Sequence, residues 1–298
     1  MAEVQKPVVA FIGLGMMGLP MAKNLLKAGH DVVATDLSAG ARADFDHAGG
    51  QSVENIADLA SSADLVITML PNGRIVREVL IGDAGIAAGL RAGTPIIDMS
   101  SSAPFETREL ADDLKTLGLR LVDAPVSGGV RRAVDGTLAI MVGGVEEDIE
   151  IVMPVLNVMG KSITVTGAVG SGHAMKALNN YVSAAGLQAA CEALLIGQEF
   201  GIEPDVLVDV LNVSTGRNNS TELKLKPFII REDFASGFSM ALMAKDIETA
   251  AELARRLGRP EPGLEGAAAL WKASLARLGK SADHTEIYNH LKTERSRR

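Results

Sequence analysis

The sequence predicts an α/β fold in which a doubly wound, mainly parallel sheet is followed by an all-helical second half. Short apolar runs that end in turn residues recur through the first 167 residues, and amphipathic segments lie between many of them. Such runs are typical of strands buried on both faces, and strands that alternate with helices predict a parallel sheet covered by helices. Beyond Gly167, strand-like runs largely disappear and Ala-rich helical patterns replace them.

The first half, which we place at residues 1–167, contains the predicted strands. Each is an apolar run that ends in a turn residue such as glycine, proline or serine. The helices between them have apolar residues at helical spacing. We predict strands at residues 8–15, 32–37, 65–71, 95–101, 121–127, 138–144 and 162–167, and helices at 17–28, 103–118 and 145–160.

The second half, residues 168–298, is predicted to be an all-helical domain for substrate binding and oligomerisation. It begins with an Ala-rich helix over about residues 171–200, which would be roughly 45 Å long and would connect the two domains. The apolar character of this helical half favours a homodimer or homotetramer. Further helices are predicted at residues 205–214, 240–258 and 263–279.

Composition excludes several classes of protein. The net charge of -8 argues against a nucleic-acid-binding protein, which would show a basic face. Cys191 is the only cysteine, so neither an intrachain disulfide nor a Cys-rich metal site is expected. No His, Asp and Glu cluster has metal-ligand spacing, and no apolar window reaches membrane-spanning length. The N-terminus lacks a signal pattern, so we expect a cytoplasmic protein with no metal.

A glycine-rich turn follows the first predicted strand. Gly13, Gly15 and Gly18 have G-x-G-x-x-G spacing, open a helix, and precede a second strand that ends in Asp36. This combination is the fingerprint of a dinucleotide site. The first glycine permits the tight turn, the second lets the backbone approach the pyrophosphate, and the third allows close packing of helix and strand. The helix N-terminus offers free N–H groups to the phosphates. The alternative is a glycine-rich turn that binds nothing.

Asp36 favours NAD over NADP. Its carboxylate should accept the ribose 2′-OH of NAD, and it would repel the 2′-phosphate of NADP. Arg42, six residues further along, could soften this preference.

The chain resembles the β-hydroxyacid dehydrogenase family, which includes 3-hydroxyisobutyrate dehydrogenase and the tartronate, glyoxylate and succinic semialdehyde reductases. The resemblance covers nearly the whole chain. It depends on FIGLGMMGLPMAKNLLKAGH, DMSSSAP, DAPVSGG, GTLAIMVGG, GSGHAMKALNN and LMAKDI, in that order. It implies a Rossmann domain, a long interdomain helix and an all-helical second domain. It also implies interconversion of a small β-hydroxy acid and its semialdehyde.

The resemblance also implies the site residues. The lysine of G-x-x-x-K-x-x-N-N is catalytic in the family, which points to Lys176, and the second asparagine, Asn180, binds substrate beside it. The substrate carboxylate is held by Ser127, Gly128 and Gly129. The residues expected at the cofactor are Gly13, Leu14, Gly15, Met16, Met17, Gly18, Asp36, Leu70, Pro71, Ser101 and Lys245.

The residues themselves support part of this assignment. Lys176 and Asn180 are four apart, so on a helix they share a face, whereas Asn179 turns away from it. A desolvated lysine can act as the general acid or base that alcohol oxidation requires. Each residue also has an ordinary structural interpretation: a lysine at a helix margin, a packing amide, or, for SGG, a plain strand-to-helix turn. His173, three residues before Lys176, is a rival base that we interpret as structural.

Two segments leave the identity of the substrate undecided. The turn continues as SGGVRRAVDG, where the family usually has small residues, so Arg131 or Arg132 could reach a second anionic group or could simply be solvated. Residues 214–224 read as a loop in which Arg217, Asn218 and Asn219 could tune specificity. The alternatives to a 3-hydroxyisobutyrate dehydrogenase-like enzyme are a reductase of tartronate, succinic or sulfonated semialdehydes, an imine reductase, which Lys176 argues against, and a non-catalytic NAD-binding module.

Overall fold

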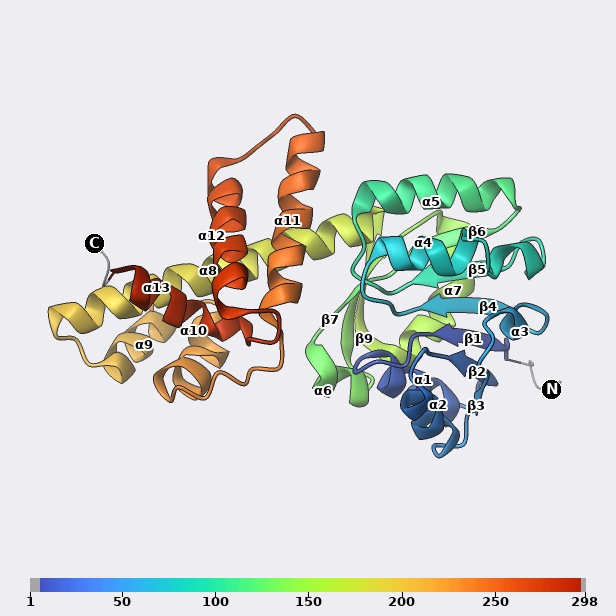
Figure 1. Cartoon of the computed structure of the whole chain (residues 1–298), viewed down its shortest axis with the longest axis horizontal. Coiled ribbons are helices and arrows are strands. Elements are labelled where there is room, and N and C mark those ends of the chain that lie inside the picture. Colours follow the sequence, from blue (N-terminus) through green and yellow to red (C-terminus); the bar gives the residue numbers. More distant parts are fainter. Residues whose placement is uncertain (1–5, 296–298) are drawn as a thin grey trace. The chain divides into compact units, whose positions relative to one another are not determined.

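The structure, a computed structural model, describes residues 6–295 (Figure 1). The chain divides into two compact units, Met1–Lys176 and Ala177–Arg298, and the division falls inside the helix α8 (Ser171–Phe200). The helix has 30 residues, and its bounds are those predicted. No helix in the described part of the chain is both long and apolar enough to cross a membrane.

The first unit contains one mixed sheet. Six strands run parallel in the order β3-β2-β1-β4-β5-β6, which is the strand order of a doubly wound dinucleotide-binding fold. β8 then pairs antiparallel with β6 and β7, and parallel with β9. The strands are β1 (Val9–Ile12), β2 (Val32–Thr35), β3 (Gln51–Ser52), β4 (Leu65–Thr68), β5 (Pro95–Asp98), β6 (Arg120–Asp123), β7 (Val126–Ser127), β8 (Leu138–Gly143) and β9 (Gly160–Gly167).

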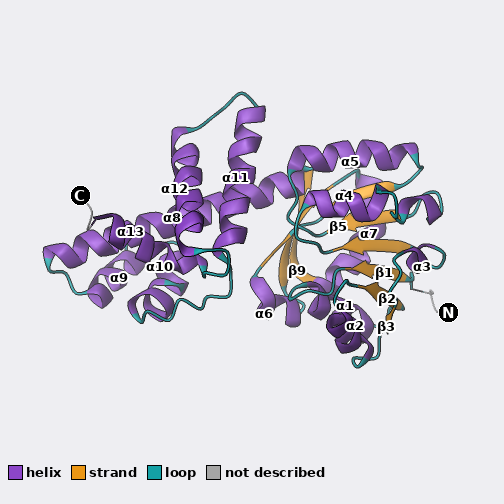
Figure 2. Ribbon diagram, in the orientation of Figure 1, coloured by secondary structure: helices purple, strands orange, loops and turns teal. Residues whose placement is uncertain are grey.

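Helices cover both faces of this sheet, with α4 and α5 on one side and α1 and α2 on the other (Figure 2). Successive strand residues therefore bury alternately in two apolar clusters: Val9 and Phe11 in one, Ala10 and Ile12 in the other. The helices are α1 (Gly18–Lys27), α2 (Ala39–Asp46), α3 (Ala57–Ala60), α4 (Gly73–Ile81), α5 (Pro104–Thr116), α6 (Gly129–Val134) and α7 (Glu146–Met159), with a 3₁₀ turn at Ala87–Gly89.

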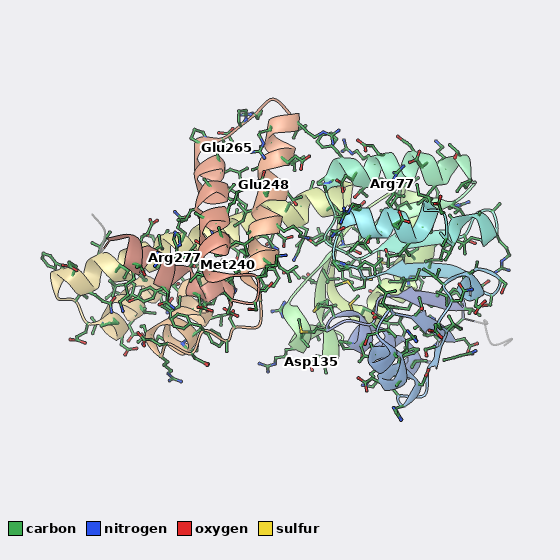
Figure 3. All side chains as sticks on the ribbon, viewed as in Figure 1. Arg77, Asp135, Met240, Glu248, Glu265 and Arg277 are labelled. Atoms are coloured by element: carbon green, nitrogen blue, oxygen red, sulfur yellow. The ribbon has the colours of Figure 1, made fainter. Side chains whose placement is uncertain are left out.

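The second unit is helical throughout its described part. Trp271 of α12 is fully buried in an apolar cluster that also contains Leu187 of α8 and Ile247 of α11. Arg255 of α11 pairs with Glu248 of its own helix and with Glu265 of α12, both labelled in Figure 3. After α8, the elements are α9 (Pro204–Val213), α10 (Asn219–Leu223), a π-helical turn (Leu225–Ile230), α11 (Met240–Arg256), α12 (Pro262–Leu278), a 3₁₀ turn (His284–Glu286) and α13 (Ile287–Arg295).

A buried polar cluster also lies in the second unit. The Lys224 Nζ is 3.0 Å from the His284 Nε2, so the histidine accepts there as a neutral ring. The His284 Nδ1 is 3.0 Å from the Phe238 carbonyl oxygen, an acceptor, which places the ring proton on Nδ1. Burial lowers the pKa of both Lys224 and His284. Protonation of His284 would put a second cation beside Lys224 in a buried place, which is unfavourable.

The prediction of a loop over residues 214–224 was wrong for its second half. Asn218 caps α10: its Oδ1 accepts from the Ser220 and Thr221 backbone N–H groups, and the Thr221 Oγ1 accepts in return from the Asn218 N–H. This capping box fixes Asn218 as a structural residue. Arg217 pairs with Glu222 at 3.7 Å. Asn219 is the first residue of α10 and is exposed.

Candidate active site

The glycine turn between β1 and α1 shows why each glycine stands where it does. Gly13 has φ +103°, and a Cβ there would lie 2.3 Å from the Met69 carbonyl oxygen. A Cβ on Gly18 would lie 1.8 Å from the Gly13 carbonyl oxygen. A Cβ on Gly15 would meet no atom within 4 Å. Gly13 and Gly18 are therefore fixed by the fold itself, whereas Gly15 borders open space.

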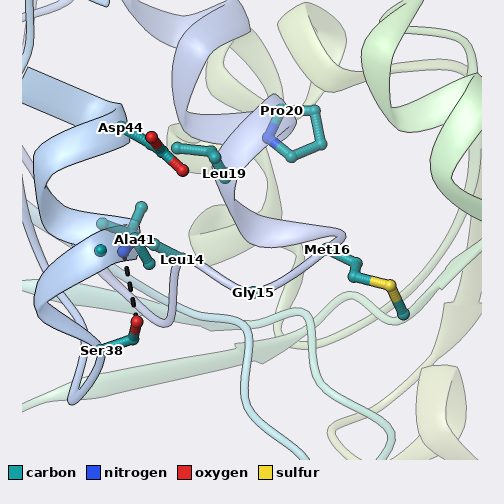
Figure 4. Close-up of a pocket in the computed structure, with 9 residues that line it drawn as sticks. Leu14, Gly15, Met16, Leu19, Pro20, Ser38, Ala41 and Asp44 are labelled. Carbon is teal, nitrogen blue, oxygen red and sulfur yellow. Dashed lines mark hydrogen bonds between the residues drawn. The ribbon is translucent and has the colours of Figure 1, made fainter. Parts of the chain in front are cut away.

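A depression of about 400 Å³ opens at this turn (Figure 4). Leu14 is buried in its floor, whereas Met16 is 73% exposed at its rim. Met17 precedes α1 and is half-buried. The depression is lined by the starts of α1 and α2: Leu14, Gly15, Met16, Leu19, Pro20, Ser38, Gly40, Ala41 and Asp44. An open cradle beside a helix N-terminus, with a glycine at its edge, fits the pyrophosphate of a dinucleotide.

Asp36 links the glycine turn to the end of β2. Its Oδ2 accepts from the Leu14 N–H at 2.7 Å, and its Oδ1 accepts from the Ser38 N–H at 2.8 Å. The Arg42 Nη1 donates to the Asp36 carbonyl oxygen at 2.6 Å, and the Nη2 is 3.8 Å from a Glu54 carboxylate oxygen. Arg42 therefore contacts the backbone of Asp36 and an exposed carboxylate, and no ion pair between Arg42 and the Asp36 side chain is formed within the described residues.

The loops after β4 and β5 lie beside the glycine turn. The Leu70 N–H donates to the Ser100 Oγ at 2.9 Å, and the Leu70 Cδ2 would be 3.1 Å from a Cβ on Gly13. Pro71 is exposed and Ser101 is half-buried. The structure thus brings Leu70 next to Gly13.

Two buried aspartates organise these loops and the start of α8. The Asp98 carboxylate accepts from Thr68, from the Ser100 N–H and from Ser102. Asp123 is fully buried at the end of β6. It accepts from the Gly170 N–H at 2.7 Å and the His173 N–H at 2.8 Å, which ties the first turn of α8 to the sheet. Burial raises the pKa of the Asp123 carboxyl.

His173 is enclosed between these aspartates. Its Nδ1 is 3.7 Å from an Asp123 oxygen and its Nε2 is 3.7 Å from an Asp98 oxygen. The Nε2 must carry a proton, because its 3.2 Å neighbour is the Ser100 carbonyl oxygen, which can only accept. The Nδ1 is 2.8 Å from the Thr107 hydroxyl. Its ring is thus surrounded by protein groups, as expected for a structural histidine.

Lys176 lies in the second turn of α8, the last residue of the first unit, and is half-buried. It follows His173 by three residues, so the two share a face of the helix. Because Asp123 holds the Gly170 and His173 backbone N–H groups, it fixes the start of the helix that carries Lys176.

The SGG turn lies between β7 and α6. Ser127 ends β7 and is half-buried, and Gly128 and Gly129 are exposed at the start of α6. Both glycines have positive φ, +135° and +69°, a region that other residues enter only with strain. Arg132 packs its stem against Gly128: a Cβ on that glycine would lie 2.4 Å from the arginine Cδ.

In the second unit, Asn180 and Lys245 meet at Asp246. Asn180 is 6% exposed, and its Nδ2 donates to the Asp246 Oδ2 at 2.5 Å. The Lys245 Nζ is 3.1 Å from the Asp246 Oδ1. Asn179 is less buried than Asn180 and donates to its side-chain oxygen at 3.0 Å. The helical geometry predicted that Asn179 turns aside, but not that it would contact its neighbour.

Sequence reasoning missed three acidic residues that position site residues within their own units: Asp98 and Asp123 in the first unit, and Asp246 in the second. Asp98 and Asp123 are the last residues of β5 and β6, at the carboxyl edge of the sheet, but the predicted strands 95–101 and 121–127 ran past them. A carboxylate inside an apolar run was the available signal. Nothing in the sequence pairs Asp246 with Asn180, because the two lie far apart on different helices.

Two family models together match most of the chain. Residues 8–167 match the family model of the NAD-binding domain of 6-phosphogluconate dehydrogenase. Residues 170–291 match the model described as NAD-binding of NADP-dependent 3-hydroxyisobutyrate dehydrogenase.

Individual relatives are similar over most of their length. The chain is 41% identical over 254 residues to 2-(hydroxymethyl)glutarate dehydrogenase of Eubacterium barkeri, covering 85% of this chain and 84% of the relative. It is 36% identical to human mitochondrial 3-hydroxyisobutyrate dehydrogenase, covering 97% and 88%. A solved structure of Mycobacterium tuberculosis 3-hydroxyisobutyrate dehydrogenase with L-serine matches with a TM-score of 0.89 and 34% identity, covering 96% and 99%.

Proposed function

The chain belongs to the β-hydroxyacid dehydrogenase family, and we propose that within this family it is an NAD-linked enzyme that interconverts 3-hydroxyisobutyrate, or a close β-hydroxy acid, with its semialdehyde. Membership makes it an oxidoreductase, a 3-hydroxyacid dehydrogenase with a nicotinamide cofactor. We propose NAD as the cofactor, a β-hydroxy acid as the substrate, and a role for each site residue.

The observation that carries the proposal is the attachment of α8 to the dinucleotide-binding unit. Asp123, at the carboxyl end of β6, accepts from two backbone N–H groups in the segment that opens α8. Ligands of open α/β sheets bind at the carboxyl ends of the strands. The helix that carries Lys176 therefore starts at the edge of the sheet where the nicotinamide is expected.

Lys176 is the proposed general acid and base. When bound, NAD supplies the acceptor for the hydride that leaves the hydroxyl-bearing carbon. Lys176, as a neutral amine, takes the proton that the hydroxyl loses in this oxidation. In the reverse direction the ammonium of Lys176 returns the proton to the aldehyde oxygen as the carbon accepts hydride. A positioned lysine suits both directions, because an amine can exchange its proton whereas a guanidinium cannot.

The remaining site residues have binding roles in this proposal. Ser127, Gly128 and Gly129 hold the substrate carboxylate through a hydroxyl and unobstructed backbone N–H groups. Asn180 binds the substrate, and Asp246 positions its amide. The residues assigned to the cofactor are Gly13, Leu14, Gly15, Met16, Met17, Gly18, Asp36, Leu70, Pro71, Ser101 and Lys245.

Asp36 supports NAD as the cofactor. Its side chain is fixed by the Leu14 and Ser38 N–H groups, and each carboxylate oxygen retains a lone pair for a ribose hydroxyl. Arg42, which could have received a 2′-phosphate, instead holds the Asp36 carbonyl oxygen and faces Glu54. A 2′-phosphate would thus meet a carboxylate without a free arginine to offset it.

We also propose that residues 1–167 and 168–298 are the functional domains of a cytoplasmic homodimer or homotetramer. The support for an oligomer is the set of exposed apolar side chains on α8 and α9, among them Val182, Phe200 and Val206, which are 67%, 84% and 55% exposed. Sedimentation velocity would measure the oligomeric state.

The proposed function is tested by following NADH at 340 nm with a panel of hydroxy acids. The panel contains 3-hydroxyisobutyrate, 3-hydroxypropionate, glycerate, serine, threonate and 4-hydroxybutyrate, each with NAD and with NADP. We expect the highest kcat/KM for a β-hydroxy acid with NAD. Absence of turnover for the whole panel, with dinucleotide binding intact, would contradict the activity. A preference for NADP would contradict the cofactor assignment alone.

A further inference from the structure

We propose that Arg132 binds a second anionic group of the substrate, so that the enzyme prefers β-hydroxy acids with a negative charge at the far end of the carbon chain. This inference rests on the proposed function, because it takes Ser127, Gly128 and Gly129 as the place where the first carboxylate binds.

Arg132 is the side chain that covers this turn. It lies four residues after Gly128, so both are on one face, and a helical side chain leans toward the N-terminus of its helix. A Cβ on Gly128 would come within 2.4 Å of the Arg132 Cδ and 2.9 Å of its Cβ. The aliphatic stem of Arg132 therefore packs on the backbone of Gly128, and its guanidinium extends from beside the turn.

No carboxylate of the described residues forms an ion pair with the Arg132 guanidinium. Among residues 6–295, the guanidinium groups of Arg131 and Arg132 form no ion pair or hydrogen bond, and both residues are exposed. Asp135 follows α6 directly (Figure 3) and forms no ion pair with either. Elsewhere in the same unit, Arg77, Arg91 and Arg120 each pair with an aspartate.

Arg131 provides a matched control on the same helix. It is turned from Arg132 by about 100° around the helix axis. A Cβ on Gly129 would meet no atom within 4 Å, so the Arg131 stem does not cover the second glycine. The two arginines have the same charge and both are exposed, and Arg132 is the one whose stem contacts Gly128.

An arginine in this position suits a planar or tetrahedral oxyanion. The guanidinium presents a fork of N–H donors that pairs with carboxylate or sulfonate in two parallel hydrogen bonds. A carboxamide at the same place offers one carbonyl acceptor and no charge, so it loses the second hydrogen bond and the ionic attraction, which lowers affinity. The preferred substrate class is therefore a small β-hydroxy acid with a distal carboxylate or sulfonate.

The test compares kcat/KM for three forms of one acid. The compounds are 2-(hydroxymethyl)succinate, the same acid with its distal carboxylate converted to a carboxamide, and the analogue with a distal sulfonate. We expect the wild type to prefer a charged form over the amide by about ten-fold or more. Arg132→Gln should bring this ratio near one, Arg132→Lys should retain part of it, and Arg131→Gln should leave it within about two-fold.

The outcomes separate this inference from the proposed function. A higher kcat/KM for either charged form supports it, and the better of the two identifies the anion. Equal turnover of all three forms by the wild type overturns the inference and leaves the proposed function intact. An Arg132→Gln variant that keeps the wild-type ratio, or that loses activity equally on every form, also overturns it. Failure of the wild type on these compounds and on 3-hydroxyisobutyrate overturns both.

Discussion

Replacing Gly15 and Gly18 separately by alanine distinguishes cofactor binding from folding. Both glycines belong to the same turn, but a Cβ on Gly15 would meet no atom within 4 Å. A Cβ on Gly18 would lie 1.8 Å from the Gly13 carbonyl oxygen and 3.2 Å from the Phe11 ring. Gly15→Ala should therefore leave the folded chain undisturbed and obstruct only the dinucleotide. Gly18→Ala should disturb the fold itself.

The sizes of the two effects follow from these distances. Forcing a methyl group into a packed place costs about 1–3 kcal/mol, so Gly18→Ala should lower Tm by about 2–12 °C for a domain of this size. Gly15→Ala should change the free energy of unfolding by less than about 0.5 kcal/mol. Its Kd for NAD should rise by about ten-fold or more, which corresponds to roughly 1.4 kcal/mol of lost binding free energy.

Thermal unfolding followed by circular dichroism and titration calorimetry with NAD measure the two effects. Gly266→Ala is a matched control, since that glycine is exposed in α12 and a Cβ there would also meet nothing within 4 Å. It should raise stability by about 0.5–1 kcal/mol and leave NAD affinity unchanged. The reasoning is refuted if Gly15→Ala binds NAD like the wild type, or if it unfolds as early as Gly18→Ala.

Three further predictions concern the second unit. Burial lowers the pKa of His284 below 6.5, so the unfolded chain binds this proton at a higher pH than the folded chain. The free energy of unfolding should therefore fall as the pH decreases below about 6.5. The Tm lost between about pH 7.5 and about pH 5.5 should be smaller in His284→Gln. Asp246→Ala leaves the Asn180 amide without its acceptor, so kcat/KM should fall by about ten-fold or more, and an unchanged value would contradict the positioning role. Burial raises the pKa of the Cys191 thiol, so DTNB should label it only after unfolding, and rapid labelling of native protein would refute its burial.

The sheet could be predicted from the sequence because its strands are buried on both faces. Apolar runs such as that around Val9–Ile12 reveal this directly. Two features of the first unit could not be predicted from the sequence. The pairing of β8 against β6 reverses the direction of the sheet, and an apolar run contains no information about strand direction. The strand β3 (Gln51–Ser52) and the helix α3 (Ala57–Ala60) are too short to show a periodic pattern of apolar residues.

The candidate site was predictable where local sequence determines geometry. The glycines of the first turn, Asp36 and the helical spacing of Lys176 and Asn180 are all short-range features. The supporting contacts are long-range. Asp123 holds Gly170 and His173 from 47 and 50 residues away, and Asp246 holds Asn180 from 66 residues away. Such pairs follow from the packing of elements, which the period of a sequence does not reveal.

The central claim is that Lys176 exchanges a proton with the substrate hydroxyl. The most direct measurement is the turnover number of Lys176→Arg with 3-hydroxyisobutyrate and NAD, because arginine keeps the positive charge but cannot release its proton. We predict a loss of about 10²- to 10⁴-fold, with NAD affinity unchanged. A variant that retains turnover within about three-fold of the wild type would contradict the claim.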